Sequence, residues 1–336
     1  MNTQVPSFQL NDGTKIPAVG MGCWLGQVGG GQRVFDMCTK ALKNGYRHFD
    51  TASGYGKSND ASKVGTYNID PVPLGNEKEV GQAINASRIP REEIYVTTKL
   101  PNDAHHRVRE SFEESLQNLQ CGYVDLYLMH WPFAVVTDSS GQTRTLRPDE
   151  HPTFIETWKE MEKLLDTGKV KTIGVSNFSV KTLTELLPHC TVTPATNQVE
   201  LHPFLPQAEL KVFCEEKGIL LTAYTPLGRS KVLLEHETVG DIAKSLTVTP
   251  AQVLLSWSVQ RGIIVVPKSE DDQRMQDNIK LVNLSDEAIE RINKIHGEPG
   301  MHRSLLKYHS PEGGAFGWSY EDFGWNMVTG GIIPSK

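Results

Sequence analysis

Short runs of β-branched and aromatic residues alternate with longer amphipathic stretches along most of this chain, and this alternation constrains the fold more than any other feature. We expect strands at 18–24, 46–52, 94–100, 124–130, 170–178, 196–202, 220–228 and 262–269. We expect helices at 33–44, 76–87, 105–120, 153–167, 179–187, 206–217, 249–260 and 271–280. Repeated β/α units imply a parallel sheet, and eight of them predict an α/β fold with a closed (β/α)8 TIM barrel.

Several segments lie outside this repeat, within what we expect to be a single domain over 1–336. Asn11-Asp12-Gly13 is a turn signal between two extended segments, so we expect an N-terminal β-hairpin that plugs the bottom of the barrel. Further helices are expected at 236–246 and 285–295. A tail at 297–336 is rich in glycine and aromatic residues without helical periodicity, and a polar insertion at 57–75 indicates a loop.

Composition excludes several classes of partner and compartment. The net charge is −6 and there is no basic run, so nucleic acid is an unexpected partner. No apolar run approaches about 18 residues and the N-terminus lacks a secretory pattern, so we expect a soluble, unprocessed protein with no membrane partner. The five cysteines show no C-x-x-C spacing, which favours the reducing cytoplasm. They are Cys23, Cys38, Cys121, Cys190 and Cys214.

In a barrel, functional side chains come from the carboxyl ends of the strands and the loops after them. Three neighbouring predicted strands end in Asp50, Lys99 and His130, and Tyr55 follows Asp50 closely. Asp50 and Lys99 are expected to pair, because burying either charge alone is costly. A strand-end ion pair of this kind is often purely structural, and that alternative stays open here.

The pairing also suggests a chemical use. A phenol has an ordinary pKa of about 10, and a neighbouring ammonium is expected to lower it. Tyr55 is therefore a candidate general acid, with His130 as a hydrogen-bond donor to the same substrate oxygen. Spacing alone does not separate carbonyl reduction from other proton-transfer chemistry. No Rossmann fingerprint and no phosphate-binding G-x-x-x-x-G-K-S/T loop occurs in the sequence.

Several motifs together resemble the aldo-keto reductase superfamily from about Phe8 to His296. They are Gly45-Tyr46-Arg47-His48-Phe49-Asp50-Thr51-Ala52 with Gly54-Tyr55-Gly56, Leu128-Met129-His130-Trp131-Pro132, Gly174-Val175-Ser176-Asn177-Phe178, Asn197-Gln198-Val199-Glu200 and Pro267-Lys268-Ser269. The resemblance implies that Asp50, Tyr55, Lys99 and His130 form a catalytic tetrad, in agreement with the reading from strand ends. It also implies an NADP(H)-dependent oxidoreductase that reduces aldehydes and ketones, reversibly with glycerol or other polyols, by hydride transfer from nicotinamide C4.

The resemblance further implies how the cofactor is held. Ser176, Asn177 and Gln198 would bind the carboxamide, and Tyr224 would stack on the nicotinamide ring. Without the motif, Asn177 and Gln198 are equally well explained as residues that hydrogen-bond the loop backbone at the ends of strands. Tyr224 is then explained as an ordinary packing residue. No metal is implied, and the chain's histidines show no ligand motif.

The turn after the eighth predicted strand resembles the family's clamp for the adenosine 2′-phosphate, which implies NADP(H) over NAD(H). The matching residues are Lys268, Ser269, Arg274, Asp277 and Asn278. Without the resemblance, these residues are interpreted as the solvent-exposed face of a helix. Glu270, Asp271 and Asp272 crowd the same turn and would weaken phosphate binding if they faced inward, and we expect them to face water.

Trp24 and Trp131 match positions that line the family's substrate pocket, although simple rim packing also accounts for them. The loop at 133–151 and the tail are expected to form the remaining walls. The aromatic tail either closes over a substrate or packs permanently on the barrel. It resembles the tail of fungal glycerol dehydrogenase-like aldo-keto reductases and implies a small carbonyl or polyol substrate. Relatives are commonly monomers, so we expect a monomer.

The insertion at 57–75 interrupts the family pattern directly after the proposed acid. One hypothesis is a functional lid. The other is a translated intron, because Gly56-Lys57-Ser58 can be encoded by the donor-like sequence GGTAAGT. Transcript sequencing decides between them, and under either hypothesis we expect a mobile loop without core contacts.

Two other classes of function are alternatives to the reductase. The same fold occurs in channel-associated β subunits, so a non-enzymatic NADP-binding regulatory module is the alternative. Steady NADPH turnover by the isolated protein favours the enzyme, and a stable tetramer with negligible turnover favours the module. A metal-dependent barrel hydrolase is disfavoured by the absence of a ligand motif among the histidines.

Overall fold

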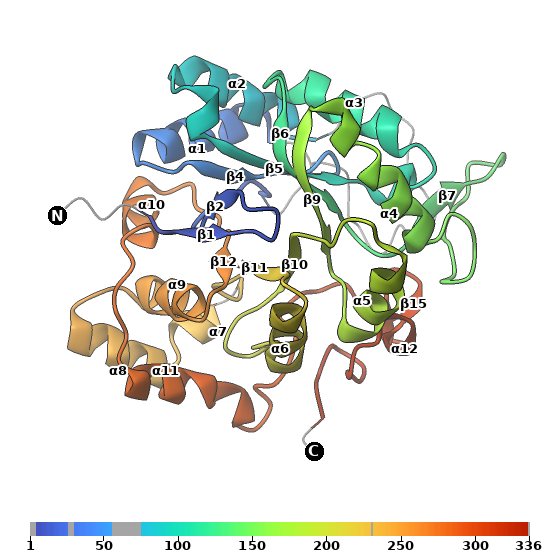
Figure 1. Cartoon of the computed structure of the whole chain (residues 1–336). Coiled ribbons are helices and arrows are strands. Elements are labelled where there is room, and N and C mark those ends of the chain that lie inside the picture. Colours follow the sequence, from blue (N-terminus) through green and yellow to red (C-terminus); the bar gives the residue numbers. More distant parts are fainter. Residues whose placement is uncertain (1–4, 26–29, 56–74, 230, 335–336) are drawn as a thin grey trace.

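The structure is a computed structural model that describes residues 5–25, 30–55, 75–229 and 231–334. Figure 1 shows a central sheet with helices packed around it. The expectation of a mobile loop at 57–75 falls, apart from Gly75, outside the described residues.

A parallel sheet forms the centre of the described part of the chain, in the strand order β12-β11-β10-β9-β6-β5-β4-β3. Its strands are β3 (Met21–Gly22), β4 (His48–Asp50), β5 (Tyr95–Leu100), β6 (Val124–Met129), β9 (Val170–Ser176), β10 (Thr196–Glu200), β11 (Leu220–Tyr224) and β12 (Ile264–Val265). The two edges meet, because Gly20 N donates to Val265 O at 2.8 Å and Val265 N donates to Ala18 O at 2.9 Å. The predicted eight strands and the closed barrel are confirmed.

Helices follow the strands as the periodicity predicted. They are α1 (Gly31–Lys43), α2 (Glu77–Ser87), α3 (Val108–Leu119), α4 (Phe154–Glu162), α5 (Val180–Leu186), α6 (Ala208–Glu216), α9 (Pro250–Gln260) and α10 (Asp272–Asn278), with α8 (Glu237–Leu246) and α11 (Asp286–Asn293) outside the repeat. Local sequence sets several of their starts. Thr153 and Thr249 each form a capping box with the residue three positions later, and Pro250 occupies the first turn of α9, where its missing N–H costs nothing.

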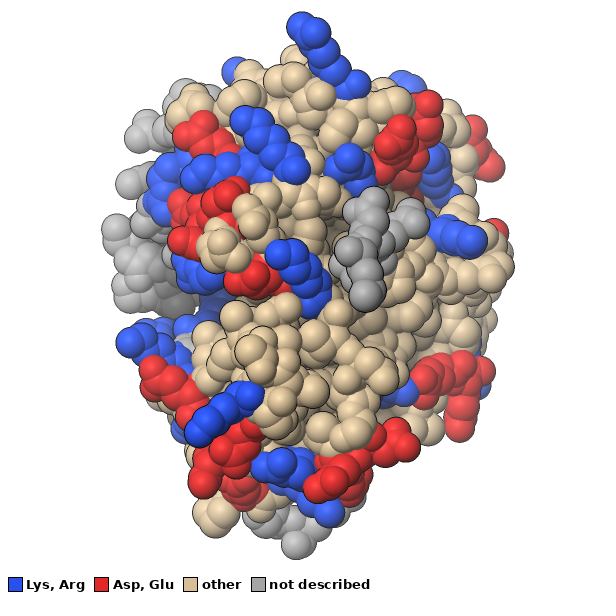
Figure 2. Space-filling model, turned by 90° about the vertical axis from the view of Figure 1, so that its left-hand side faces the viewer, with Lys and Arg blue, Asp and Glu red and all other residues tan. Residues whose placement is uncertain are grey.

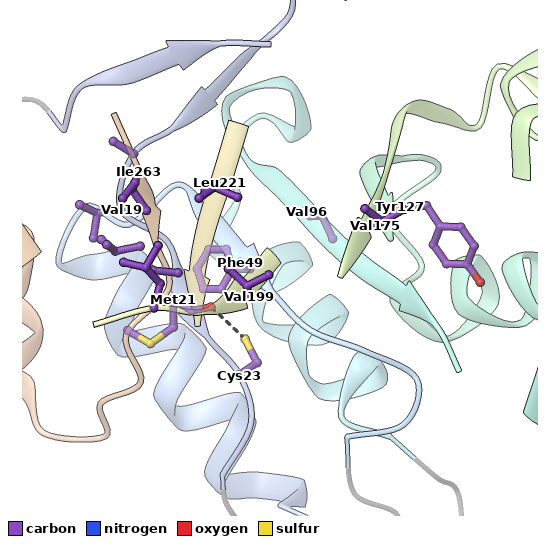
Figure 3. Close-up of a cluster of buried hydrophobic side chains, with 14 of the residues drawn as sticks. Val19, Met21, Cys23, Phe49, Val96, Tyr127, Val175, Val199, Leu221 and Ile263 are labelled. Atoms are coloured by element: carbon purple, nitrogen blue, oxygen red, sulfur yellow. Dashed lines mark hydrogen bonds between the residues drawn. The ribbon is translucent and has the colours of Figure 1, made fainter. Parts of the chain in front are cut away.

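Strand alternation decides which side chains enter the barrel. Along β5, Val96 and Leu100 belong to the apolar core, while Thr98 turns to the same side and donates to Glu77 of α2 at 2.6 Å. Figure 3 shows Val96 in this core with residues of several other strands. Thr97 and Lys99 alternate with these residues along the strand, so their side chains point to the opposite face, into the barrel. The Lys99 side chain is fully buried there.

The N-terminal hairpin closes the amino ends of the strands. β1 (Ser7–Gln9) pairs antiparallel with β2 (Lys15–Pro17), as predicted from the turn at Asn11-Asp12-Gly13. Leu10 and Ile16 pack in a separate apolar cluster with barrel residues. The barrel members of that cluster are Tyr95, Leu126, Leu128, Ala195 and Ile264. The bottom is plugged, so ligand access is left to the opposite end.

Three segments contain structure that the periodicity did not predict. The loop after β6 folds back as a hairpin of β7 (Val135–Thr137) and β8 (Thr143–Thr145). The tail contains β13 (His309–Ser310), β14 (Gly314–Ala315), β15 (Trp318–Ser319) and the one-turn helix α12 (Tyr320–Phe323), and α7 (Lys231–Leu234) follows β11. The Trp318 indole donates to Leu146 O at 2.7 Å, which ties the tail to the loop after β6.

Among the described residues, no helix has both the length and the apolar character needed to cross a bilayer.

Candidate active site

Lys99 is the centre of a polar cluster at the carboxyl end of the barrel. Its Nζ donates to Asp50 Oδ1 at 2.7 Å, to the Thr51 carbonyl at 2.9 Å and to the Tyr55 phenol oxygen at 3.1 Å. An ammonium has three protons to donate, so these three acceptors satisfy it completely. The predicted pairing of Asp50 with Lys99 is confirmed, and Tyr55 joins the same ammonium.

Both carboxylate oxygens of Asp50 accept hydrogen bonds from other side chains. Its second oxygen, Oδ2, accepts a hydrogen bond from Gln198 Nε2 at 2.6 Å. Desolvation acts to lower the pKa of Lys99, but the Asp50 carboxylate and the Tyr55 phenol raise it, and the net pKa lies above the ordinary value. The ammonium therefore stays charged at neutral pH although it is buried.

The Tyr55 pKa differs from our expectation. Burial raises it, Lys99 lowers it in part, Asp50 raises it again, and the net value lies above that of an exposed tyrosine. The expectation of a lowered pKa was wrong, because the sequence shows the ammonium next to the phenol but not the extent of desolvation. A phenol with a raised pKa stays protonated at neutral pH, so it keeps a proton to donate.

His130, the first residue after β6, approaches the same phenol. The Tyr55 and His130 rings lie edge to face, with centroids 5.9 Å apart. Burial and the Lys99 charge lower the pKa of His130 to about 3, so the imidazole is neutral at physiological pH. A neutral imidazole carries one N–H and one free lone pair, which suits a hydrogen-bond donor to a substrate oxygen.

The residues predicted for the carboxamide lie together on neighbouring strand ends. Ser176 Oγ donates to Gln198 O at 2.8 Å, and Asn177 Nδ2 donates to His130 O at 2.9 Å. Asn177 adopts a left-handed backbone with φ of 65°. The Tyr224 hydroxyl donates to Asn177 Oδ1 at 2.7 Å, so the ring at the end of β11 and the amide after β9 meet across the intervening strand β10.

The alternative interpretation, in which Asn177 and Gln198 are structural residues that hydrogen-bond at the ends of strands, also has support. Asn177 bonds backbone of the loop after β6, and the Gln198 amide nitrogen is occupied by Asp50. These bonds fix the amide groups in place beside the cluster of Asp50, Tyr55, Lys99 and His130. Binding a carboxamide would require part of this hydrogen bonding to be exchanged for the ligand.

The residues predicted for the adenosine 2′-phosphate and the adenine lie in the turn before α10 and along α10 itself. Ser269 and Asn278 are buried, whereas Arg274 is exposed. Asp271 caps α10 by accepting from Arg274 N at 2.9 Å, and Asp277 accepts from Gln273 Nε2 at 3.1 Å.

The acidic residues of this turn were expected to face water. Glu270 does so only in part, because its side chain is 31% exposed and its carboxylate is paired with two cations. Its carboxylate accepts from Lys268 Nζ at 2.5 Å and pairs with Arg33 of α1 at 2.9 Å. Asp271 and Asp272 are exposed, as expected.

The two tryptophans predicted for the substrate pocket have different neighbours. The Arg229 guanidinium lies 3.8 Å from the centroid of the Trp24 ring, in cation–π contact. Trp131 lies edge-on to Tyr308 at 5.5 Å and to Phe316 at 4.9 Å. The aromatic tail thus packs on the loop after β6 in this structure, and Trp131 is buried beneath it.

Sequence reasoning missed three residues at this end of the barrel. Arg229 follows Leu227-Gly228 at the end of the predicted seventh strand, a position that barrel topology marks as functional. Tyr308 brings its hydroxyl to 3.4 Å from that of Tyr224. Phe133 packs 5.7 Å from Phe316. Tyr308 and Phe133 lie in the tail and in the loop at 133–151, which were expected to form pocket walls, but without periodicity no sequence signal singled out these two residues.

The described residues contain no group of three or more His, Cys, Asp or Glu side chains placed to hold a metal ion. They do fit a nicotinamide dinucleotide. Fixed amides and an aromatic ring lie beside Tyr55, and cationic side chains lie at the turn before α10, as a carboxamide and a phosphate respectively require.

Comparison with known proteins gives one consistent result. Residues 18–296 match the model of the aldo/keto reductase family. The glycerol 2-dehydrogenase (NADP(+)) of Saccharomyces cerevisiae is 41% identical over 320 residues, which cover 90% of this chain and 95% of the relative. The D-galacturonate reductase of Hypocrea jecorina is 38% identical, with 93% and 97% covered.

Solved structures agree with the sequence relatives. The aldose reductase of Schistosoma japonicum superimposes with a TM-score of 0.73 at 36% identity, covering 91% of this chain and 94% of that one. An aldo/keto reductase from Brucella melitensis gives a TM-score of 0.71 at 37% identity, with 86% and 99% covered.

Proposed function

This chain belongs to the aldo/keto reductase family and is an oxidoreductase, and from this premise we propose that it reduces small aldehydes and ketones with NADPH. The observation that carries the proposal is the position of Lys99 Nζ between Asp50 and the Tyr55 phenol, with His130 facing the same phenol. A nicotinamide dinucleotide held at this site would supply the hydride that the carbonyl carbon accepts.

The residues of the chain supply the proton and the orientation. Tyr55 donates its proton to the oxygen that becomes the alcohol, and the Lys99 ammonium stabilises the phenolate that remains. His130, as a neutral donor, holds the carbonyl oxygen near the phenol. Asp50, fixed by Gln198, keeps the ammonium charged and in place. Alcohol oxidation uses the same groups in reverse.

Cofactor binding is assigned to the strand ends next to this cluster. Ser176, Asn177 and Gln198, whose side chains lie together here, would hold the carboxamide, and Tyr224 would pack against the nicotinamide ring. At the other end of the dinucleotide, Lys268, Ser269, Arg274 and Asn278 would form the clamp for the adenosine 2′-phosphate and the adenine, with Asp277 near the adenine amine. The NADP(+) in the name of the yeast relative supports the phosphorylated cofactor.

The substrate class is a small polar carbonyl compound or the matching polyol. Two relatives are named for glycerol and for D-galacturonate, both of which carry several hydroxyl groups. Trp24 and Trp131 form apolar walls, and Arg229 adds a cation at the rim near Trp24. All five cysteines are free thiols, which supports the cytoplasm as the compartment.

A regulatory NADP-binding module remains the alternative function, but the named relatives are dehydrogenases and reductases. A panel assay separates the two. The purified protein is mixed with NADPH or NADH and a series of aldehydes and ketoses, and with NADP⁺ and polyols, while light scattering gives its mass. We expect a monomer that turns over NADPH steadily with small aldehydes. Absence of turnover with every carbonyl tested, in a protein that binds NADPH as a tetramer, would contradict the enzyme proposal.

A further inference from the structure

The turn before α10 holds a carboxylate where the proposed function places a phosphate. We propose that Glu270 is a cofactor-selectivity residue, because its carboxylate competes with the 2′-phosphate for Lys268 and reduces the preference for NADP(H) over NAD(H). This inference rests on the proposed cofactor site and concerns how strongly that site discriminates.

Glu270 is positioned as an internal counter-ion. Its Oε1 accepts from Lys268 Nζ at 2.5 Å, two residues away along the chain. An ammonium that already has a carboxylate at this distance must exchange that contact for the phosphate when the dinucleotide binds. The gain from the new ion pair is then reduced by the loss of the old one.

Arg33 of α1 fixes the carboxylate in this position. Its Nε donates to Glu270 Oε2 at 3.0 Å, and its Nη2 contacts both carboxylate oxygens, at 3.0 and 2.9 Å. Lys40, also on α1, donates to the Glu270 carbonyl at 3.4 Å. Because a forked guanidinium holds the carboxylate from the other side, Glu270 stays at the site after Lys268 turns to a phosphate, and its charge then lies next to a dianion.

Arg274, the other predicted cationic ligand of the phosphate, also has an acidic side chain next to it. Arg274 Nε lies 3.7 Å from Asp271 Oδ1, so both cations of the proposed clamp have acidic neighbours within the turn. Figure 2 shows the face that includes α8 and α10 in Figure 1, where basic and acidic side chains are interspersed. The pair with Asp271 is longer and more exposed than the pair with Glu270, so Glu270 is the stronger competitor.

The test uses nucleotide fragments that cannot take part in hydride transfer. Titration calorimetry measures the affinity of adenosine 2′,5′-bisphosphate, which carries the 2′-phosphate, and of ADP, which lacks it. We expect Glu270→Gln to tighten binding of the bisphosphate about fivefold and to leave ADP within about twofold, since removing the carboxylate removes both the competition and the repulsion. Raising the salt concentration should shrink the difference.

Asp272→Asn is the matched control. It removes one negative charge from the same turn, but Asp272 accepts from the neutral amides of Asn44 at 2.8 Å and Gln276 at 2.9 Å and pairs with no cation among the described residues. We expect both nucleotides to bind this variant as they bind the wild type. An equal gain for Asp272→Asn would show a general charge effect and overturn the proposal, as would a bisphosphate affinity that is unchanged or weaker in Glu270→Gln.

Failure of the underlying cofactor site looks different. In that case the wild-type protein would bind the bisphosphate no more tightly than ADP and NADPH no more tightly than NADH. Glu270→Gln would then change neither ratio, and the selectivity proposal would fall with the cofactor site. If the wild type prefers the 2′-phosphate and the variant does not increase that preference, only the role of Glu270 is wrong.

Discussion

Lys99 is a buried ammonium whose three hydrogen bonds all go to groups of the proposed active site. Its position and its pairing with Asp50 were predictable, because residues at the ends of adjacent parallel strands face the same rim. The direction of the Tyr55 pKa was not predictable, because it depends on how far burial outweighs the ammonium. The contact of Lys268 with Glu270 was missed because its geometry depends on Arg33, far away in the sequence.

Replacing Lys99 tests its role directly. We expect Lys99→Met to lower kcat by about 10²–10⁴-fold, the range in which general acid catalysis acts, and to leave NADPH affinity nearly unchanged. Folding stability should also fall by about 3–5 kcal/mol, since Asp50 is left as a buried charge without its partner.

Lys171→Met is the control for this experiment. Lys171 also lies on a barrel strand and pairs with Asp125 at 3.0 Å, but it is half exposed and lies at the start of β9, away from the tetrad. Its replacement should leave kcat within about twofold. A Lys99→Met enzyme with wild-type kcat would contradict the assignment.

Among the elements, the strands and long helices were predictable, whereas the tail and the loop after β6 were not. β7, β8 and the strands of the tail have two or three residues each, too few to show a period. Their positions are set by tertiary contacts, such as the bond from Trp318 to Leu146 O. The tail's aromatic content was visible in the sequence, but its packing partners Trp131 and Phe133 were not.

A single carboxylate at the end of β10 anchors the start of the tail. Glu200 Oε1 accepts from Leu305 N at 2.7 Å, and Oε2 accepts from Ser304 Oγ at 2.5 Å. We expect Glu200→Gln to loosen the tail by about 1–3 kcal/mol, because an amide cannot accept at both positions as a carboxylate does. Trypsin should cleave near Lys307 faster, and KM for the carbonyl substrate should rise more than kcat falls.

The control is Glu298→Gln, which removes an exposed carboxylate that contacts His236 at 3.2 Å. We expect it to digest at the wild-type rate. If Glu200→Gln leaves both digestion and KM unchanged, Glu200 does not hold the tail.

The insertion is predicted to be dispensable for the barrel. After it, Asn76 accepts from Thr51 Oγ1 and donates to Cys23 O, and Glu77 accepts from Thr98 at 2.6 Å. These bonds anchor the start of α2 without help from the insertion. We expect deletion of 57–75 to leave the circular dichroism spectrum unchanged and Tm within about 4 °C. Failure of the deleted protein to fold would contradict this and would argue against the translated-intron hypothesis.

At the scale of the whole molecule, the barrel was predictable because eight repeats of one unit leave few alternative folds. The polar side chains inside the barrel were not predictable from the sequence. His48 lies inside it, bonded to Thr97 at 3.1 Å, and burial lowers the pKa of this histidine to about 4. The pKa of His105 is likewise lowered to about 3 by burial. Both rings are neutral in the folded protein.

This gives the stability of the whole molecule a definite pH dependence. The unfolded chain takes up protons on these histidines near pH 6.5, whereas the folded chain does so only near pH 3–4. Stability is therefore full above pH 6.5 and is lost as the pH falls toward 4. By pH 5 the loss is about 2 kcal/mol per histidine.

Urea unfolding at pH 7.5 and pH 5.0 measures this loss. We expect the free energy of unfolding to decrease between the two conditions in the wild type, and the decrease to be smaller by about 2 kcal/mol in His48→Gln, which has no proton to gain. An identical decrease in both proteins would show that His48 does not couple to unfolding.

The central claim is that the Tyr55 phenol gives the proton that completes carbonyl reduction. The most direct test is the rate of NADPH oxidation by Tyr55→Phe in a single turnover with a saturating aldehyde. The matched control is Tyr95→Phe, which removes a buried phenol at the opposite end of the barrel. The account predicts a loss of about 10²-fold or more for Tyr55→Phe with NADPH affinity retained, and a wild-type rate for the control. A wild-type rate in Tyr55→Phe would contradict it.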